Sequence, residues 1–212
     1  RGVFVETGAG GGGLFSGQGS VPTAEDTTDV IAVVTADAVP ETSGAINSGA
    51  GDVFVDAHGA FHTQADAFAF SIGVVAAGAS IATAKSRGSV KARMNGDITG
   101  GQNATVQAVA VSDAIASAEA AGGGLIEVTI PISYAEAKPV IEASIGADAT
   151  TLVDGDIKVN AVSDGNADAS GSARAGSLAG VGSMKVTSVV SPSLSAFVGN
   201  GATIGGATLD IN

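Results

Sequence analysis

The two histidines of the chain, His58 and His62, are the residues with the clearest potential for metal chemistry. They lie four residues apart, and Asp56 and Asp66 are close to them in the sequence. Histidine nitrogens and carboxylate oxygens are common zinc ligands. On an extended strand, however, residues four apart share a face but are separated by roughly 13 Å, too far for one ion. We therefore interpret both histidines as part of a solvated polar face.

A second chemical motif is the stretch 164-DGNAD-168, which has the D-x-N-x-D spacing of a calcium loop. Such a loop also needs glycine at its sixth position and glutamate at its twelfth, where this chain has Ala169 and Ala175. The glycine-rich nonapeptide of calcium-binding β-rolls is absent from the sequence. We interpret the stretch as an outward polar strand or turn, with an adventitious calcium site as the alternative.

The glycine runs 8-GAGGGG-13 and 122-GGG-124 differ from phosphate-binding loops, because no Lys followed by Ser or Thr comes after them. We interpret them as turns or flexible junctions. No serine of a nucleophile elbow lies near a credible base, and two histidines are few for hydrolase chemistry. The sequence thus predicts no catalytic, cofactor-binding or metal-binding residues, and we expect that the protein is not an enzyme.

The composition limits both the core and the partners. Of 212 residues, 45% are hydrophobic, yet only 4% are aromatic and 32 are glycine, so each core position can contribute little. A net charge of -12 argues against nucleic acid, and no apolar run reaches the roughly 18 residues needed to insert into a membrane. The chain has no cysteine, and it starts at Arg1 without Met or signal peptide, so we expect a processed product or a fragment.

A weak repeat of about fifty-two residues organises the sequence. One landmark, Val55, Val106, Val159 and Ile211, has spacings of 51, 53 and 52, with Val5 placed 50 before Val55. A second, Ile46, Met94, Ile145 and Val198, has spacings of 48, 51 and 53. We predict one repetitive domain, 1–212, with approximate units 2–50, 51–100, 101–154 and 155–206, and 207–212 as the opening strand of a further unit. The first unit looks least regular, because 8–20 replaces the long alternating strand.

Within the units, small apolar residues alternate with polar ones at a period of two, which is typical of a half-buried strand. The predicted inward set includes Val55 to Ala69, Val106 to Ala120 and Val159 to Ala175, counting every second residue. Strands paired in register, about 4.8 Å apart, would enclose a thin interior of Ala, Gly and Ser. The predicted fold class is an all-β repeat solenoid, or right-handed β-helix, and an antiparallel β-sandwich is the alternative.

Some residues depart from this pattern. Phe68 and Phe70 fall on the outward parity, and we favour a bulge that turns them inward over an exposed apolar strip. Outward apolar positions that suggest a covered outer face are Val109, Val111 and Ile115. Bends or bulges are expected at Pro131, Pro139 and Pro192.

The opener 51-GDVFVDA-57 recurs as 155-GDIKVNA-161, followed by Ala/Gly alternation and preceded by an [IV]-[GN] joint. In these features the sequence resembles the repetitive stalk or passenger regions of large bacterial surface adhesins and filamentous-haemagglutinin-like exoproteins. The resemblance implies a β-helix that serves as a passive rod outside the cell or on its surface. Those families usually have coils of about twenty residues, and the fifty-residue unit departs from that pattern.

The predicted function is structural: a subunit or segment of an extracellular fibre, sheath or adhesin stalk that assembles with itself, end to end, through open strands. Deleting residues 1–7 or 207–212 should then abolish assembly. The alternative is an adhesin module that binds a glycan or host surface with a flat solenoid face. One tyrosine and no tryptophan weaken the glycan version, and the threonines share no register of the kind that ice binding needs.

Overall fold

The computed structural model describes residues 2–35, 45–46 and 48–212, and within these ranges it contains strands and no helix. The alternation of small and polar residues explains this result, because it suits a pleated surface with one buried face. Every strand pairing in the described residues is parallel. The all-β prediction is therefore confirmed, the arrangement is consistent with a β-solenoid, and the antiparallel sandwich is wrong.

The largest sheet has the strand order β1-β5-β8-β11-β15, with β2 paired to β5 and β12 paired to β8. Its strands are β1 (Gly2–Ser20), β2 (Thr23–Asp26), β5 (Val53–Ser86), β8 (Ala104–Ala137), β11 (Asp156–Gly182), β12 (Lys185–Val190) and β15 (Thr208–Ile211).

Two smaller sheets repeat the same parallel order, β3-β6-β9-β13 and β4-β7-β10-β14. The strands of the first are β3 (Asp29–Val34), β6 (Ser89–Met94), β9 (Val140–Ile145) and β13 (Ser193–Val198). Those of the second are β4 (Ala45–Ile46), β7 (Asp97–Thr99), β10 (Thr150–Leu152) and β14 (Thr203–Gly205). We call β1–β4, β5–β7, β8–β10 and β11–β14 the first, second, third and fourth levels.

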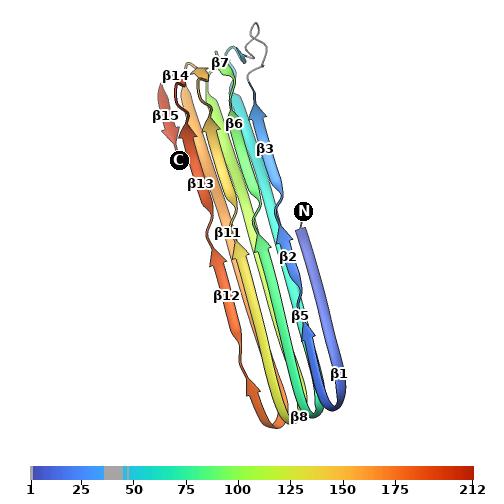
Figure 1. Cartoon of the computed structure of the whole chain (residues 1–212). Coiled ribbons are helices and arrows are strands. Elements are labelled where there is room, and N and C mark those ends of the chain that lie inside the picture. Colours follow the sequence, from blue (N-terminus) through green and yellow to red (C-terminus); the bar gives the residue numbers. More distant parts are fainter. Residues whose placement is uncertain (1, 36–44, 47) are drawn as a thin grey trace.

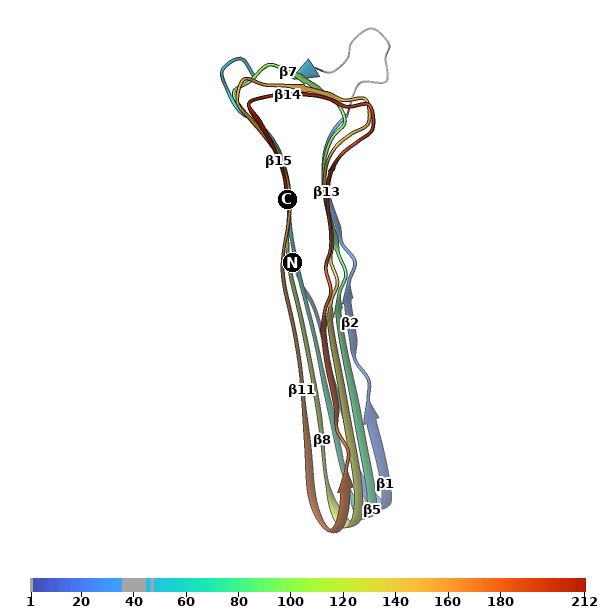
Figure 2. The ribbon, with the colours of Figure 1, turned by 90° about the vertical axis from the view of Figure 1, so that its left-hand side faces the viewer.

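The levels stack side by side along the sheets (Figure 1). In the side view, β5, β8 and β11 run down one wall, bend at the lower end and turn back towards the opposite wall (Figure 2). The upper end is wider and is spanned by the sheet that contains β7 and β14 (Figure 2). The molecule is thus narrow at the bend and broad at the other end.

Two apolar clusters fill these two regions with side chains of different size. The cluster near β7 contains large residues, among them Met94, Ile98, Ile141 and Ile145. The cluster between the two long walls consists entirely of alanine in its buried part, for example Ala65, Ala82, Ala116 and Ala135. Across this thin interior, Ser112 Oγ donates to Ser86 Oγ at 2.7 Å. The predicted interior of small residues is confirmed for the narrow part only.

The register confirms most of the landmarks and corrects the first level. Val55, Val106, Val159 and Ile211 pair in succession, as do Met94, Ile145 and Val198. In the first level, however, Val5 pairs with Ala65, Val34 with Met94 and Ile46 with Ile98. The predicted places of Val5 and Ile46 are therefore wrong.

The cause is a change of spacing within the first level. Val34 is sixty residues before its partner Met94, whereas Ala45 is fifty-two before its partner Asp97. The first level thus has eight extra residues between Val34 and Ala45, and a fixed period cannot align it. The run 8–20 also does not replace the long strand, because it belongs to β1 and pairs with β5.

Two local predictions fail and two succeed. No bulge turns Phe68 and Phe70 inward: they are 44% and 37% exposed, and Ala67 and Ala69 are buried. Pro131 lies within β8, in continuous register with Ser80 of β5. By contrast, Pro139 and Pro192 lie at the breaks between β8 and β9 and between β12 and β13, as expected for bends.

Candidate functional site: outer face and stack edges

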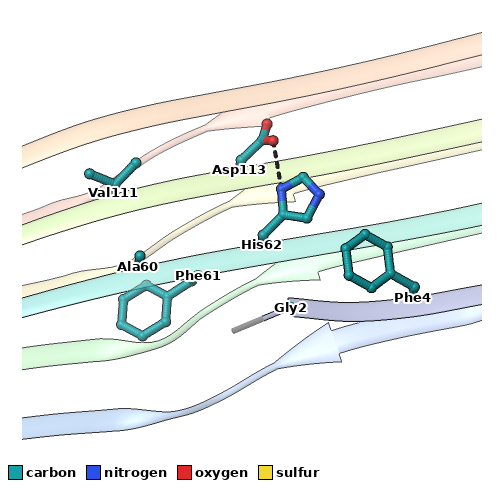
Figure 3. A pocket seen from close by; sticks show the side chains of 7 residues that line it. All are labelled: Gly2, Phe4, Ala60, Phe61, His62, Val111 and Asp113. Atoms are coloured by element: carbon teal, nitrogen blue, oxygen red, sulfur yellow. Dashed lines mark ion pairs between the residues drawn. The ribbon is translucent and has the colours of Figure 1, made fainter.

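A shallow hollow of about 430 Å³ lies on the outer face where the first three levels meet. His62 of β5 forms an ion pair with Asp113 of β8, with 2.8 Å between Nδ1 and Oδ2 (Figure 3). The ring of Phe4 of β1 lies 5.2 Å from the His62 ring, between centroids. Three neighbouring parallel strands thus bring together three residues that are far apart in the sequence.

This hollow holds a base and its carboxylate but no nucleophile. Its lining, Gly2, Phe4, Ala60, Phe61, His62, Val111 and Asp113, contains no Ser, Thr, Cys or Lys. A histidine–carboxylate pair activates a nucleophile only when one lies within hydrogen-bond reach. The arrangement therefore fits an ion pair that joins two levels, bordered by the apolar side chains of Phe4 and Val111, better than an acyl-transfer site.

The other residues considered for metal chemistry do not converge. His58 Nε2 lies 2.8 Å from Asp56 Oδ2 on its own strand, whereas His62 turns to the next level. Asp66 accepts a hydrogen bond from the amide of Gln64 at 2.7 Å. Within the described ranges, no group of three or more His, Asp or Glu side chains could hold a metal ion.

The stretch 164-DGNAD-168 is part of the extended strand β11 and does not form a loop. Asp164 and Asp168 are outward positions four residues apart, so their carboxylates are separated by roughly 13 Å of strand. Asn166 donates to Asp113 Oδ1 of the neighbouring level at 3.0 Å. The three residues therefore do not surround one calcium ion, and the strand interpretation of this stretch is confirmed.

The strongest electrostatic feature is a cluster around Glu136 that joins three levels. Its side chain is 2% exposed, and its carboxylate accepts hydrogen bonds from Arg87 Nε at 2.6 Å and from the hydroxyl of Tyr134. Lys138 Nζ lies 3.3 Å from the same carboxylate, and Arg87 also contacts Glu25 of the first level at 3.3 Å. The cluster thus links β2, β8 and the junction that follows β5.

Burial alone would raise the pKa of Glu136, but hydrogen bonds from Arg87, Tyr134 and Lys138 lower it to about 2, from an ordinary 4.5. A group whose pKa is lower in the folded than in the unfolded chain stabilises the fold at pH values above the unfolded pKa. This stabilisation is lost as the pH falls to the folded pKa. Between pH 5 and pH 2 the free energy of unfolding should fall in the native chain. We expect this decrease to be about 2 kcal/mol larger in the native chain than in Glu136→Gln. Urea titrations measure this, and equal pH dependence in both chains would contradict it.

Further polar contacts also join successive levels. Arg93 of β6 donates to both carboxylate oxygens of Glu142 of β9, at 2.7 and 3.0 Å. The hydrogen bonds between these two side chains lower the pKa of Glu142 and raise that of Arg93. A row of hydrogen bonds at the start of the long strands links the second, third and fourth levels and β15: Asn103 Nδ2 donates to Asp52, the backbone N–H of Asp156 donates to Asn103 Oδ1, and Thr208 Oγ1 donates to Asp156. Charged and amide side chains of the outer face thus hold the levels together.

The edges of the stack are the second candidate site. Within the described residues, β1 pairs only with β5, and β11 pairs with β15 only from Asp156 to Val159. Beyond that stretch, one side of β11 carries backbone groups without a strand partner. The sequence predicted open strands, but it could not show that they would be this long.

The contacts of Glu136 and Arg87 were not found by sequence reasoning. The two residues are forty-nine positions apart, and neither residue type by itself marks that separation as a contact. The repeat itself was the available signal, because an acid and a base about one period apart are brought onto neighbouring strands.

No helix in the described ranges has the length and apolarity needed to span a bilayer. Searches with family models, among curated proteins and among solved structures gave no match to this chain.

Proposed function

We propose that the protein is a structural subunit or segment of an extracellular fibre, sheath or adhesin stalk. In this proposal it is a β-solenoid of about four units of roughly fifty-two residues that continues end to end through its open strands. The observation that carries the proposal is the long, regular outer strand at each end of the stack. Open, flat strand edges are templates for further pairing.

The fourth level has the side-chain exposure of a surface that lacks its neighbour. Ala167 and Ala169 of β11 are partly exposed, whereas Ala114 and Ala116, at the same register positions of β8, are fully buried. A further level would bury the alanines of β11 in the same way. It would also pair the backbone groups of β11 that have no strand partner, among which the N–H of Ala169 donates to Ser188 Oγ at 3.1 Å in the single molecule.

Strand β1 of a second copy suits this edge in side-chain size and register. Gly2 lies in register with His62, Asp113 and, one level further, Asn166. On a stacked copy, β1 would therefore meet β11 from Asn166 onwards. Because β15 occupies only Asp156–Val159, the two strands would not compete for the same stretch. Neither β1 nor β11 contains the proline or inward charge that protects natural edges.

The proposal that the protein is not an enzyme rests on the His62–Asp113 hollow, whose lining offers no nucleophile. Its extracellular location is proposed from the resemblance to surface stalks. The alternative adhesin function gains some support from Phe4 and Phe54, which are exposed on the outer face.

The test places a charge on the inward face of the free edge. Ala169→Lys points a lysine into the position that a further level would bury, whereas Ser170→Lys adds the same charge to the outward face of the same strand. In a single molecule the Ala169→Lys side chain can reach solvent through the open end. We expect electron microscopy to show fibres for the native chain and Ser170→Lys, and separate short rods for Ala169→Lys.

Fibre diffraction of the native assembly should show a reflection at about 4.7–4.8 Å along the fibre axis. Circular dichroism of Ala169→Lys should retain the native strand spectrum, which separates loss of assembly from loss of folding. Fibres of unchanged length from folded Ala169→Lys would refute end-to-end strand pairing.

A further inference from the structure

A row of large apolar side chains projects from the lower bend, and we call it the bend ridge. Its residues are Leu14, Phe15, Val74, Val75, Leu125, Ile126 and Leu178. They are exposed to between 37% (Val75) and 87% (Leu178). Phe15, Val75 and Ile126 lie in one register column that ends at Ala179. Each level thus adds a step to the same ridge.

The walls beside the ridge carry almost no charge, although the chain has a net charge of -12. Glu127 is buried, and Arg174 is the other charged residue in the four bend segments. These segments are residues 7–24, 67–84, 120–135 and 169–184. The exposed acids therefore lie away from the bend, and two bends can approach without bringing exposed negative charges together.

We propose that the bend ridge binds the bend ridge of a second copy of this chain, with the two stacks antiparallel. This interface goes beyond the proposed end-to-end assembly, because it uses the turned side of each level and leaves the strand edges free. It would join two rods, or two fibres, side by side, with the bends of one stack against the bends of the other.

The size of the ridge suits such an interface. An aromatic side chain such as Phe offers about 150–250 Å² when exposed, and the aliphatic ridge residues are somewhat smaller. With the observed exposures, the seven ridge residues present roughly 700–800 Å², close to the ~800 Å² that each partner buries in a standard interface. An exposed apolar area of this size in one region is uncommon on a monomer.

The order of side-chain sizes favours the antiparallel arrangement. In that arrangement the first level faces the fourth and the second faces the third, so Phe15 meets Ala179 and Val75 meets Ile126. Each pair then has a similar total size, and the gap between the stacks is uniform. A parallel arrangement would place Phe15 against Phe15 and Ala179 against Ala179, which leaves a void at one end.

The chain has no cysteine, so single cysteines report this geometry directly. We would work in the Ala169→Lys background, where end-to-end growth is blocked. Equal amounts of Phe15→Cys and Ala179→Cys chains are mixed and oxidised. We expect mixed disulfide dimers to exceed either self-dimer at least fivefold. The control is Phe54→Cys, which is 67% exposed but lies far from the bend, and we expect it to give only background dimer.

A second measurement removes the apolar side chains. Leu125→Asn combined with Leu178→Asn should raise the dimer dissociation constant in sedimentation equilibrium at least tenfold, whereas Phe54→Asn should leave it unchanged. Self-dimers of Phe15→Cys would overturn the antiparallel arrangement. If the Ala169→Lys protein is monomeric, a second copy is not the partner of the ridge. The same conclusion follows if the protein instead binds phosphatidylcholine vesicles through Leu125 and Leu178. Neither result would affect the end-to-end test.

Discussion

Replacing Gly124 by alanine is expected to lower the free energy of unfolding by about 3 kcal/mol or more. A Cβ at this position would lie 1.9 Å from the carbonyl oxygen of Gly73, in the level beside it. Gly73 is crowded in the same way, with a Cβ only 2.4 Å from the Gly13 carbonyl oxygen. Because the obstacle is backbone, no side chain can move aside, and the stacked bends must separate.

The neighbouring residue Gly123 provides a matched control. Its Cβ would lie 3.7 Å from the Gly176 carbonyl oxygen, an ordinary contact distance. Gly123→Ala should therefore be neutral, or stabilise by about 0.4–1 kcal/mol through the unfolded chain. Urea unfolding of both variants measures the difference, and equal effects would show that the bends do not touch as described.

The second large effect concerns two glutamates of β8 that are both almost fully buried. Glu127 is 1% exposed, and neither of its carboxylate oxygens has a hydrogen-bond partner among the described residues. It occupies space that Gly122 leaves free, since a Cβ there would lie 2.4 Å from Glu127 Oε1. An unpaired buried polar group costs free energy, so Glu127→Met should raise the free energy of unfolding by about 1–3 kcal/mol.

Glu136 should respond to the same substitution with the opposite sign. Its carboxylate is held by Arg87, Tyr134 and Lys138, and Glu136→Met would leave these groups without their partner. We expect a loss of about 2 kcal/mol, limited by the partial exposure of Arg87. Thermal or urea unfolding distinguishes the two variants. A destabilised Glu127→Met protein would mean that Glu127 makes a stabilising contact within the bend.

The sequence predicts the long strands of this fold better than the bends and junctions between strands. Alternation from Val55 to Ala69 and from Val106 to Ala120 identifies the inward faces, because a period of two is the direct consequence of a pleated strand. The fixed repeat period could not align the first level with the others. Eight extra residues before Ala45 shift one half of this level relative to the other half. Phe68 and Phe70 were assigned inward by hydrophobicity, whereas the unbroken register of β5 keeps them outward.

The candidate sites were harder to predict for a different reason. Contacts such as His62–Asp113 and Arg87–Glu136 join residues about one period apart, and a weak repeat leaves their register uncertain by several residues. The bend ridge has a simple signature, an apolar pair after glycine or serine near Leu14, Val74, Leu125 and Leu178. It becomes visible only when the bends are known to stack.

The pairing of β5 with β8, which extends from Val53 to Ser86, also has a mechanical consequence. Hydrogen bonds between parallel strands lie across the strands, and therefore along the direction in which the levels stack. A pull along that direction loads the bonds of a whole level at once, so they share the force. A pull along a strand direction instead shears neighbouring levels past one another. The rod should accordingly show a tensile strength along its axis that grows with wall length, irrespective of the number of levels.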